Sequence, residues 1–393
     1  MNSKLLPFAI LLMLTLAGGK ISLAVEPEKG LHSANGMEDP PDFSVVPDAQ
    51  WLAIERSVDR GIEYMLSQQN SDGSFGIGEL ERPAVTSLVC MAMISRGHAS
   101  DESPSASHAS QTIVRGIDYV LSRQRDDGLL GHSQHSLSLS EYSKFMIYNH
   151  SICGMFLTEV YGMTGPKRAK RIEVAVNKAL SFVRVLQQRS IPAAGESRDR
   201  GGWRYLDPPQ HGDFYSDLSV TSWIVMFLRS AENAGFNVPI EWAKQAIAYV
   251  VRCYDERSGA FSYAPGHSHM VTRGMVGAGV VCLFLTGHKE PDMEQRCGKW
   301  ILAHPYDRYN QKLNSFEHYH YGAYYQSQAA LQIGGQTWER FYPRFVDTFL
   351  SHQNRDGSWQ PEGKRPELGR AYTTAMAVLA LTPPYQLLPI YQR

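Results

Sequence analysis

The chain has 393 residues, of which 43% are apolar and 20% are charged, a balance that excludes an intrinsically disordered protein. Its 38 basic residues nearly match its 39 acidic residues, and the net charge of −1 argues against a nucleic-acid partner. The five cysteines are an odd number and form no Cys-x-x-Cys pair, so neither a disulfide scaffold nor a zinc ribbon is expected.

The first segment, residues 1–24, has the pattern of a secretory signal peptide. Lys4 precedes an apolar run over residues 5–17, and a small-x-small site ends at Ala24. We therefore expect an exported protein, periplasmic or secreted, with an uncleaved anchor as the alternative. Residues 25–50 are rich in Pro, Glu, Asp, Ser and Gly, which predicts a flexible lead-in before a fold that begins near Trp51. No later stretch is apolar enough to span a membrane after signal cleavage.

The rest of the chain, residues 51–393, repeats one pattern. An amphipathic helix ends in Gln, and an Asp-Gly turn and an aromatic or apolar residue follow. The clearest copies are residues 61–76, 116–128 and 345–359, with weaker copies from Ala179 and Ala246 and a degenerate one from Cys297. The spacing of roughly 45–65 residues leaves room for two helices in each repeat.

Each repeat continues into a second helix with few charges on any face. These helices are expected over residues 84–97, 147–161, 219–234, 274–286, 321–333 and 373–381. A helix that is apolar all round is buried. About six such helices require a closed inner ring with the amphipathic helices around it, because an open solenoid would leave its ends exposed.

The Gln…Asp-Gly-Ser-Trp element resembles the repeat of squalene–hopene cyclases and of protein prenyltransferase β subunits. The chain looks closer still to exported prenyltransferase/squalene oxidase repeat proteins of planctomycete-type bacteria, over residues 201–205, 217–223 and 372–379. The resemblance covers nearly all of residues 51–393. It implies an all-α fold, an (α/α)6 toroid with a central cavity, but it implies no reaction.

The chemistry of class II terpene cyclases depends on an Asp-x-Asp-Asp motif whose middle acid protonates an alkene. The matching segment here keeps Asp217 but has Ser219 and Val220 at the next two acid positions. A hydroxyl has too high a pKa for that step, so hopene-type cyclisation is not expected. Asp217 then fits a helix N-cap better. Asp126-Asp127 lacks the third acid of a class I magnesium cluster and fits a turn.

The zinc site of protein prenyltransferases needs an Asp-x-Cys pair, which the sequence lacks. Thioester, Gly-x-Ser-x-Gly, Walker A and His-Glu-x-x-His motifs are missing as well. Two histidine pairs remain, His318 with His320 and His267 with His269. In an extended loop, residues i and i+2 point the same way and could share a divalent metal, so the first pair is the candidate metal site. The alternative is that both are ordinary loop histidines.

The expected inner-helix starts also gather aromatic residues, among them Phe214, which fit an isoprenoid pocket, a sugar-stacking platform or plain packing. Arg204 and Arg273 could clamp an anionic ligand. The candidate ligand-binding residues are Trp203, Tyr215, Thr221, Arg273, Tyr321, Tyr324 and Tyr372, and the candidate acid/base residues are Asp217, His150 and His318.

The sequence therefore predicts an exported toroid that binds a lipid, an isoprenoid or a glycan in a central aromatic pocket. If it is an enzyme, a transferase- or lyase-like reaction is expected, with a polysaccharide lyase as one alternative. The competing class is a non-catalytic scaffold for a protein or a cell-wall polymer. A catalytic site should bring several polar groups together in an open pocket, whereas a scaffold should have its cavity filled by side chains.

Overall fold

The computed structural model describes residues 40–132, 139–189, 191, 197–207, 215–362 and 368–392, without the side chains of 139–141. The expected signal peptide, nearly all of the expected lead-in and Phe214 lie outside these ranges. The chain divides into the units Met1–Gly30 and Leu31–Arg393, and everything below concerns the second. In the described part of the chain, no helix is long and apolar enough to cross a membrane.

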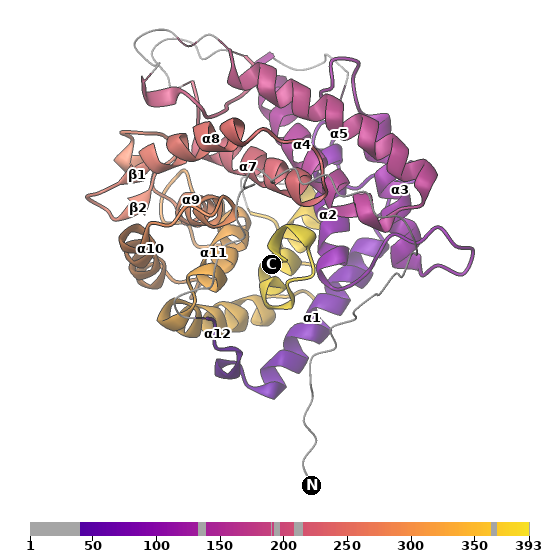
Figure 1. Ribbon diagram of the computed structural model, residues 1–393. Coiled ribbons are helices and arrows are strands. Elements are labelled where there is room, and N and C mark those ends of the chain that lie inside the picture. Colours follow the sequence, from indigo (N-terminus) through magenta and orange to yellow (C-terminus); the bar gives the residue numbers. More distant parts are fainter. Residues whose placement is uncertain are drawn as a thin grey trace, which may run out of the picture. The chain divides into compact units, whose positions relative to one another are not determined.

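The fold is built from helices in two concentric layers (Figure 1). The inner layer consists of α2 (Arg82–Ser95), α4 (Leu139–Val160), α7 (Leu218–Asn233), α9 (Arg273–Leu285), α11 (Tyr319–Ile333) and α13 (Gly369–Leu381). The outer layer consists of α1 (Asp48–Leu66), α3 (His108–Ser122), α5 (Pro166–Gln187), α8 (Ile240–Arg252), α10 (Pro291–Ala303) and α12 (Gly335–Ser351).

Short elements join and cover these helices. They are the 3-10 helices η1 (Phe43–Val45), η2 (Tyr161–Met163), η3 (Ser268–Met270), η5 (Pro383–Tyr385) and η6 (Pro389–Tyr391), and a two-stranded antiparallel ribbon of β1 (Tyr254–Asp255) and β2 (Ala260–Phe261). The segment after α13 packs on the inner layer, since η5 contacts α11 and α13 and η6 contacts α7.

The inner helices form a closed ring. Each contacts the next in chain order, and α13 contacts α2. This confirms the predicted (α/α)6 toroid. The inner helices are buried on every side because they carry almost no charge; in α2, every residue from Pro83 to Ser95 is buried. The outer helices bury one stripe only, as α8 does through Ala243, Ala246 and Val250.

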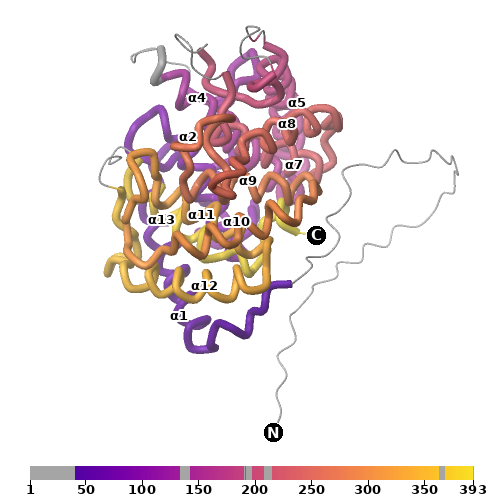
Figure 2. The backbone as a smooth tube through the Cα atoms, turned by 90° about the vertical axis from the view of Figure 1, so that its left-hand side faces the viewer, coloured from indigo at the N-terminus to yellow at the C-terminus, as the bar shows by residue number. Residues whose placement is uncertain are grey.

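The repeated glutamines join neighbouring repeats. Gln69 donates from Nε2 to the carbonyl of Gly73 in its own turn (3.0 Å) and to the carbonyl of Thr112 in the next outer helix (3.0 Å). In the last repeat, Gln353 donates to Gly357 (2.8 Å) and back to Ser57 of α1 (2.8 Å). The final turn therefore docks on the first helix, and Figure 2 shows α1 and α12 side by side.

In four repeats, the residue after the turn is hydrogen-bonded to an inner helix. The backbone N–H groups of Phe75, Trp203 and Trp359 donate to the hydroxyls of Thr86, Thr221 and Thr374, at 2.8, 3.0 and 3.3 Å. In the second repeat, Leu130 N–H donates instead to Nδ1 of His150 (3.1 Å). His150 thus accepts the hydrogen bond that a threonine accepts in the three repeats named above.

The fold begins before Trp51. The indole N–H of Trp338 donates to the carbonyl of Asp42 (3.2 Å), and the ring of Phe43 packs edge-on against the same indole. Pro47 is extended and precedes the first turn of α1, which starts at Asp48. All five cysteines are buried and unpaired, so they serve as small core residues.

Candidate functional site

The ring contains a cavity of about 730 Å³ that lies among the first turns of the inner helices. Its lining is layered, because residues four apart on a helix stand above one another on one face. We define the rim layer as Tyr148, Ser219, Tyr321 and Tyr372, and the floor layer as Leu88, Ile152, Trp223 and Met376. Three of the four floor residues follow a rim residue by four positions. The cavity is therefore polar at its mouth and apolar at depth.

The rim layer is joined by hydroxyl groups. Ser219, in the first turn of α7, shares hydrogen bonds with Tyr148 (2.8 Å) and Tyr321 (3.0 Å). Burial raises the pKa of both phenols well above the usual value, so both stay neutral at physiological pH. Neutral phenols offer hydrogen bonds to a ligand without adding charge.

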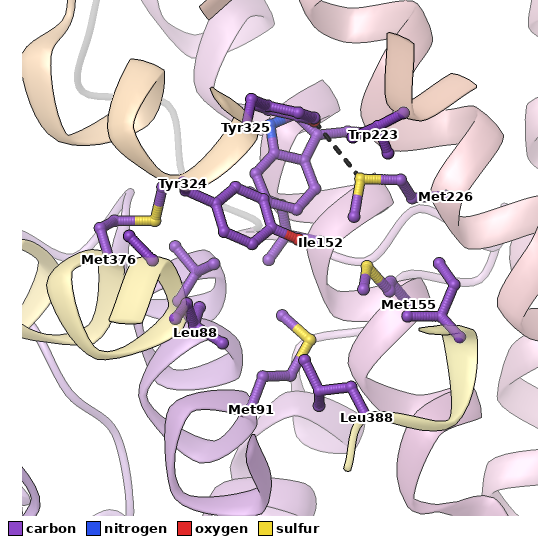
Figure 3. Packing of buried hydrophobic residues seen from close by; sticks show 14 of the residues in the cluster. Leu88, Met91, Ile152, Met155, Trp223, Met226, Tyr324, Tyr325, Met376 and Leu388 are labelled. Carbon is purple, nitrogen blue, oxygen red and sulfur yellow. Dashed lines mark hydrogen bonds between the residues drawn. The ribbon is translucent and has the colours of Figure 1, made fainter. Parts of the chain in front are cut away.

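The floor ends in stacked aromatic rings. Trp223 stacks on Tyr324 with the ring centroids 5.7 Å apart and the planes 7° from parallel. Met91, Met155, Met226 and Leu388 are buried and do not line the cavity, and we call them the base layer (Figure 3). Met155 and Met226 each follow a floor residue by three positions on the same helix. The floor layer thus separates the cavity from a buried layer of apolar side chains, three of which are unbranched methionines.

Three cations line the mouth: Lys144, Arg204 and Lys312. Two of them are paired with carboxylates behind the wall, since Arg204 contacts Asp217 at 3.3 Å and Lys312 contacts Glu362 at 3.4 Å. Both carboxylates are almost fully buried, and neither lines the cavity. They hold the two cationic groups in place beside the cavity.

The lining described by the structure has a single carboxylate, that of Glu81. It accepts a hydrogen bond from the backbone N–H of Gly78 (2.8 Å) in the turn before α2. The first turns of the inner helices surround the same mouth, and the positive ends of their helix dipoles add partial positive charge. The mouth therefore favours an anionic or hydrogen-bond-accepting group over a cation.

Asp217 is the N-cap of α7 and lies behind the wall. Its carboxylate accepts from the backbone N–H of Val220 (2.8 Å). Burial raises the pKa of Asp217 to about 6, although Arg204 acts in the opposite direction. Arg204 and Tyr263 both contact this carboxylate and line the cavity, so Asp217 can act on a ligand through these two side chains.

The two predicted metal ligands both have Nδ1 near the carboxylate of Glu362, at 3.8 Å for His318 and 3.6 Å for His320. His318 is the N-cap of α11 and lines the cavity. His320 is buried, and its Nε2 shares a hydrogen bond with the hydroxyl of Tyr309 (2.9 Å). Burial alone would raise the pKa of Glu362, but His320 and His318 hold it at about 2.

Across the ranges that the structure describes, no three His, Cys, Asp or Glu side chains are arranged to hold a metal ion. The predicted pair therefore lacks a third ligand of this kind there, and Lys312 already contacts the neighbouring Glu362. In the second histidine pair, Nδ1 of His267 lies 3.0 Å from the carbonyl oxygen of Pro265.

His150 lies outside the cavity, contrary to the prediction that it lines the pocket. Its Nδ1 accepts from Leu130, its Nε2 donates to the carbonyl of Ala179 (3.2 Å), and Phe182 packs on the ring. Burial lowers the pKa of His150 to about 4, so the ring is neutral. Both nitrogens are used in packing α4 against α5.

Five other predicted ligand-binding residues also lie outside the cavity lining. Thr221 accepts the hydrogen bond from the backbone N–H of Trp203 that is described above, and the backbone carbonyl of Tyr215 accepts a hydrogen bond from the guanidinium of Arg189. The guanidinium of Arg273 donates to the carbonyls of His304 (3.0 Å), Gln311 (3.0 Å) and Pro305 (2.7 Å). It therefore holds the loop before α11. Tyr324 lies one layer behind Trp223. Of the predicted site residues, Tyr321, Tyr372 and His318 line the cavity.

Sequence reasoning singled out Trp223 among the aromatic residues of a pocket but missed Lys144, Lys312 and the other floor residues, Leu88, Ile152 and Met376. Lys144 lies four positions before Tyr148, so a search of the same helix face would have found it. The same search, continued four positions beyond the rim residues, leads to the floor residues Ile152, Trp223 and Met376. Lys312 lies in the long loop between α10 and α11, where the repeat is degenerate and gives no signal.

No known family model and no curated protein sequence matches the chain. Solved structures match in fold. One is a type II terpene cyclase from Scytonema in complex with its substrate, geranylgeranyl dihydroxybenzoate; it is 12% identical, with a TM-score of 0.51 over 86% of this chain and 99% of that one. Another is a possible member of family GH105 from Klebsiella pneumoniae, 10% identical, with a TM-score of 0.53 over 88% and 95%.

A third is an alpha-amylase from Clostridium perfringens, 10% identical, with a TM-score of 0.51 over 84% of this chain and 98% of that one. At these identities the likeness shows the fold alone. It defines the chain as an α/α toroid of the kind found in terpene cyclases and in glycoside-acting enzymes.

Proposed function

We propose that this protein binds an apolar molecule of the isoprenoid or lipid class in its ring, with the polar head of that molecule at the rim layer. The layered lining carries this proposal. The floor residues Leu88, Ile152, Trp223 and Met376 offer a ligand no hydrogen-bonding group apart from the indole N–H, whereas the rim offers hydroxyls and cations.

The apolar floor favours a lipid or isoprenoid over a glycan. A buried sugar needs a polar partner for each hydroxyl, because an unpaired buried hydroxyl costs about 1–3 kcal/mol. The rim could serve a sugar, but the floor could not. The geranylgeranyl compound held by the Scytonema cyclase is consistent with an isoprenoid tail.

We propose binding without alkene protonation. Ser219 stands at the position that resembles the proton donor of class II cyclases, and its partners Tyr148 and Tyr321 are also hydroxyls. None of the three is acidic enough to protonate an alkene. We further propose that the protein meets its ligand outside the cytoplasm, on the signal-like pattern of residues 1–24.

The test is a titration of the purified protein by calorimetry with dodecanoate, dodecyl phosphate and dodecanol. We expect all three to bind, and the two anions to bind more tightly because of Lys144, Arg204 and Lys312. Leu88→Trp should fill the floor and weaken binding at least tenfold. Leu52→Trp is the matched control, since Leu52 is 53% exposed on α1, and it should bind as the wild type does.

Equal binding by the Leu88→Trp and Leu52→Trp proteins would place the ligand outside the ring. If the folded wild type binds none of these probes but binds oligosaccharides, the glycan alternative replaces the proposal. If it binds neither, the scaffold alternative replaces it.

A further inference from the structure

The indole of Trp223 is the boundary between the cavity and the base layer. Trp223 lines the cavity, yet its side chain is only 2% exposed. Met226 lies one turn further along the same face of α7. A tail that entered from the rim would therefore meet the indole before it reached the base layer.

The indole is braced from behind. It stacks on Tyr324, whose hydroxyl is bonded to the hydroxyl of Tyr391 (2.9 Å) in the C-terminal segment. That segment is anchored in turn, since the N–H of Ile390 donates to Glu159 of α4 (3.2 Å) and Asn233 of α7 donates to the carbonyl of Pro389 (3.4 Å). Downward movement of the indole would have to displace the C-terminal segment.

The base layer has the chemistry of a site for an apolar tail. Met91, Met155 and Met226 come from three inner helices, and Leu388 from the C-terminal segment (Figure 3). All four are buried. Methionine side chains are unbranched and change shape easily, so they can adjust to a flexible chain. The braced indole closes this layer from the cavity side together with Leu88, Ile152 and Met376.

We propose that Trp223, braced by Tyr324, sets the length of the tail that the cavity accepts, and that the base layer is a latent subsite for longer tails. This inference rests on the proposed function and adds a specificity-determining residue to it. An aromatic side chain of about 200 Å² covers as much surface as about six methylene groups. Removal of the indole should extend the accepted tail by a similar length.

The experiment measures dissociation constants for straight-chain fatty acids from octanoate to eicosanoate. In the wild type, affinity should rise about fourfold per methylene and then reach a plateau once the tail meets Trp223. In Trp223→Ala, the rise should continue over several further methylenes. Trp223→Leu should give an intermediate plateau, and it replaces Trp223→Ala if that protein does not fold by circular dichroism.

Two further variants show whether the plateau depends on the floor or on the rest of the cavity wall. Trp223→Ala combined with Met155→Phe should refill the base layer and restore the wild-type plateau. Met275→Ala shortens a side chain that lines the cavity on α9, so it should lower the affinity for every acid but leave the chain length of the plateau where it is.

A folded Trp223→Ala protein that binds short acids normally and keeps the wild-type plateau would overturn this inference and leave the proposed function intact. A folded wild type that binds no acid of any length would overturn the proposed function, and this inference with it.

Discussion

At the scale of single residues, His150 has a structural role that only a comparison of the repeats makes visible. A histidine at the start of an inner helix has the position of a catalytic residue, and the sequence suggested one. In three other repeats, however, the residue at that place is a threonine that accepts a backbone hydrogen bond, and His150 accepts the same bond through Nδ1. An alignment of the repeats on their inner helices would have given this role without a structure.

Variants of Asp217 test whether its carboxylate does more than cap α7. Asn caps helices about as well as Asp. Because burial raises the pKa of Asp217 to about 6, the charged form is disfavoured in the fold, so Asp217→Asn should raise the free energy of unfolding at pH 7, by up to about 3 kcal/mol. Asp217→Ala should be about 1–2 kcal/mol less stable than Asp217→Asn because Val220 loses its acceptor.

Urea denaturation of the two variants, read beside calorimetry with dodecanoate, checks this prediction. If Asp217→Asn melts normally but loses most of its affinity or an activity, a cap-only role is excluded and the pairing with Arg204 becomes part of the site.

At the scale of elements, the sequence predicted what local patterns determine. The inner helices were found because a helix without charges has to be buried, and each predicted range overlaps the helix in the structure. The lining was only partly found, since whether an inner-helix residue faces the cavity or a neighbouring helix depends on the rotation of that helix in the ring. Thr221 and Tyr321 are both near helix starts, yet only Tyr321 faces the cavity.

Substitutions at two glycines, Gly357 and Gly235, test whether the last turn needs its close approach to α1. Gly357 and Gly235 have almost the same φ, 87° and 85°. A Cβ on Gly357 would lie 2.2 Å from the carbonyl oxygen of Arg60 on α1, whereas one on Gly235 would meet nothing within 4 Å. Gly235→Ala should cost about 1–2 kcal/mol from backbone strain, and Gly357→Ala about 3 kcal/mol or more.

Chemical denaturation of both variants measures the difference. Equal losses would mean that the last turn does not need its close approach to the first helix.

At the scale of the whole molecule, the C-terminal segment depends on a buried acid. Glu159 accepts from Ser230 and from the N–H of Ile390, and burial raises its pKa to about 7. A carboxyl whose pKa is higher in the folded than in the unfolded state favours folding while it is protonated. That contribution is complete below about pH 4.5 and is lost as the pH rises through about 7.

The free energies of unfolding of the wild type and of Glu159→Gln should therefore diverge between pH 4.5 and 7.5. The variant should gain up to about 3 kcal/mol on the wild type at the upper end. His150, whose pKa is lowered, acts in the opposite sense at low pH but is the same in both proteins. Parallel curves would show that Glu159 does not titrate in this range.

The bond from Gln353 to Ser57 has a consequence for how the protein comes apart. In an open array of repeats, the terminal units lack one neighbour and fray first. Here the last repeat supplies the neighbour that the first would otherwise lack. We therefore expect the slowest hydrogen exchange to be shared around the inner helices, and the protein to lose its structure in one cooperative step.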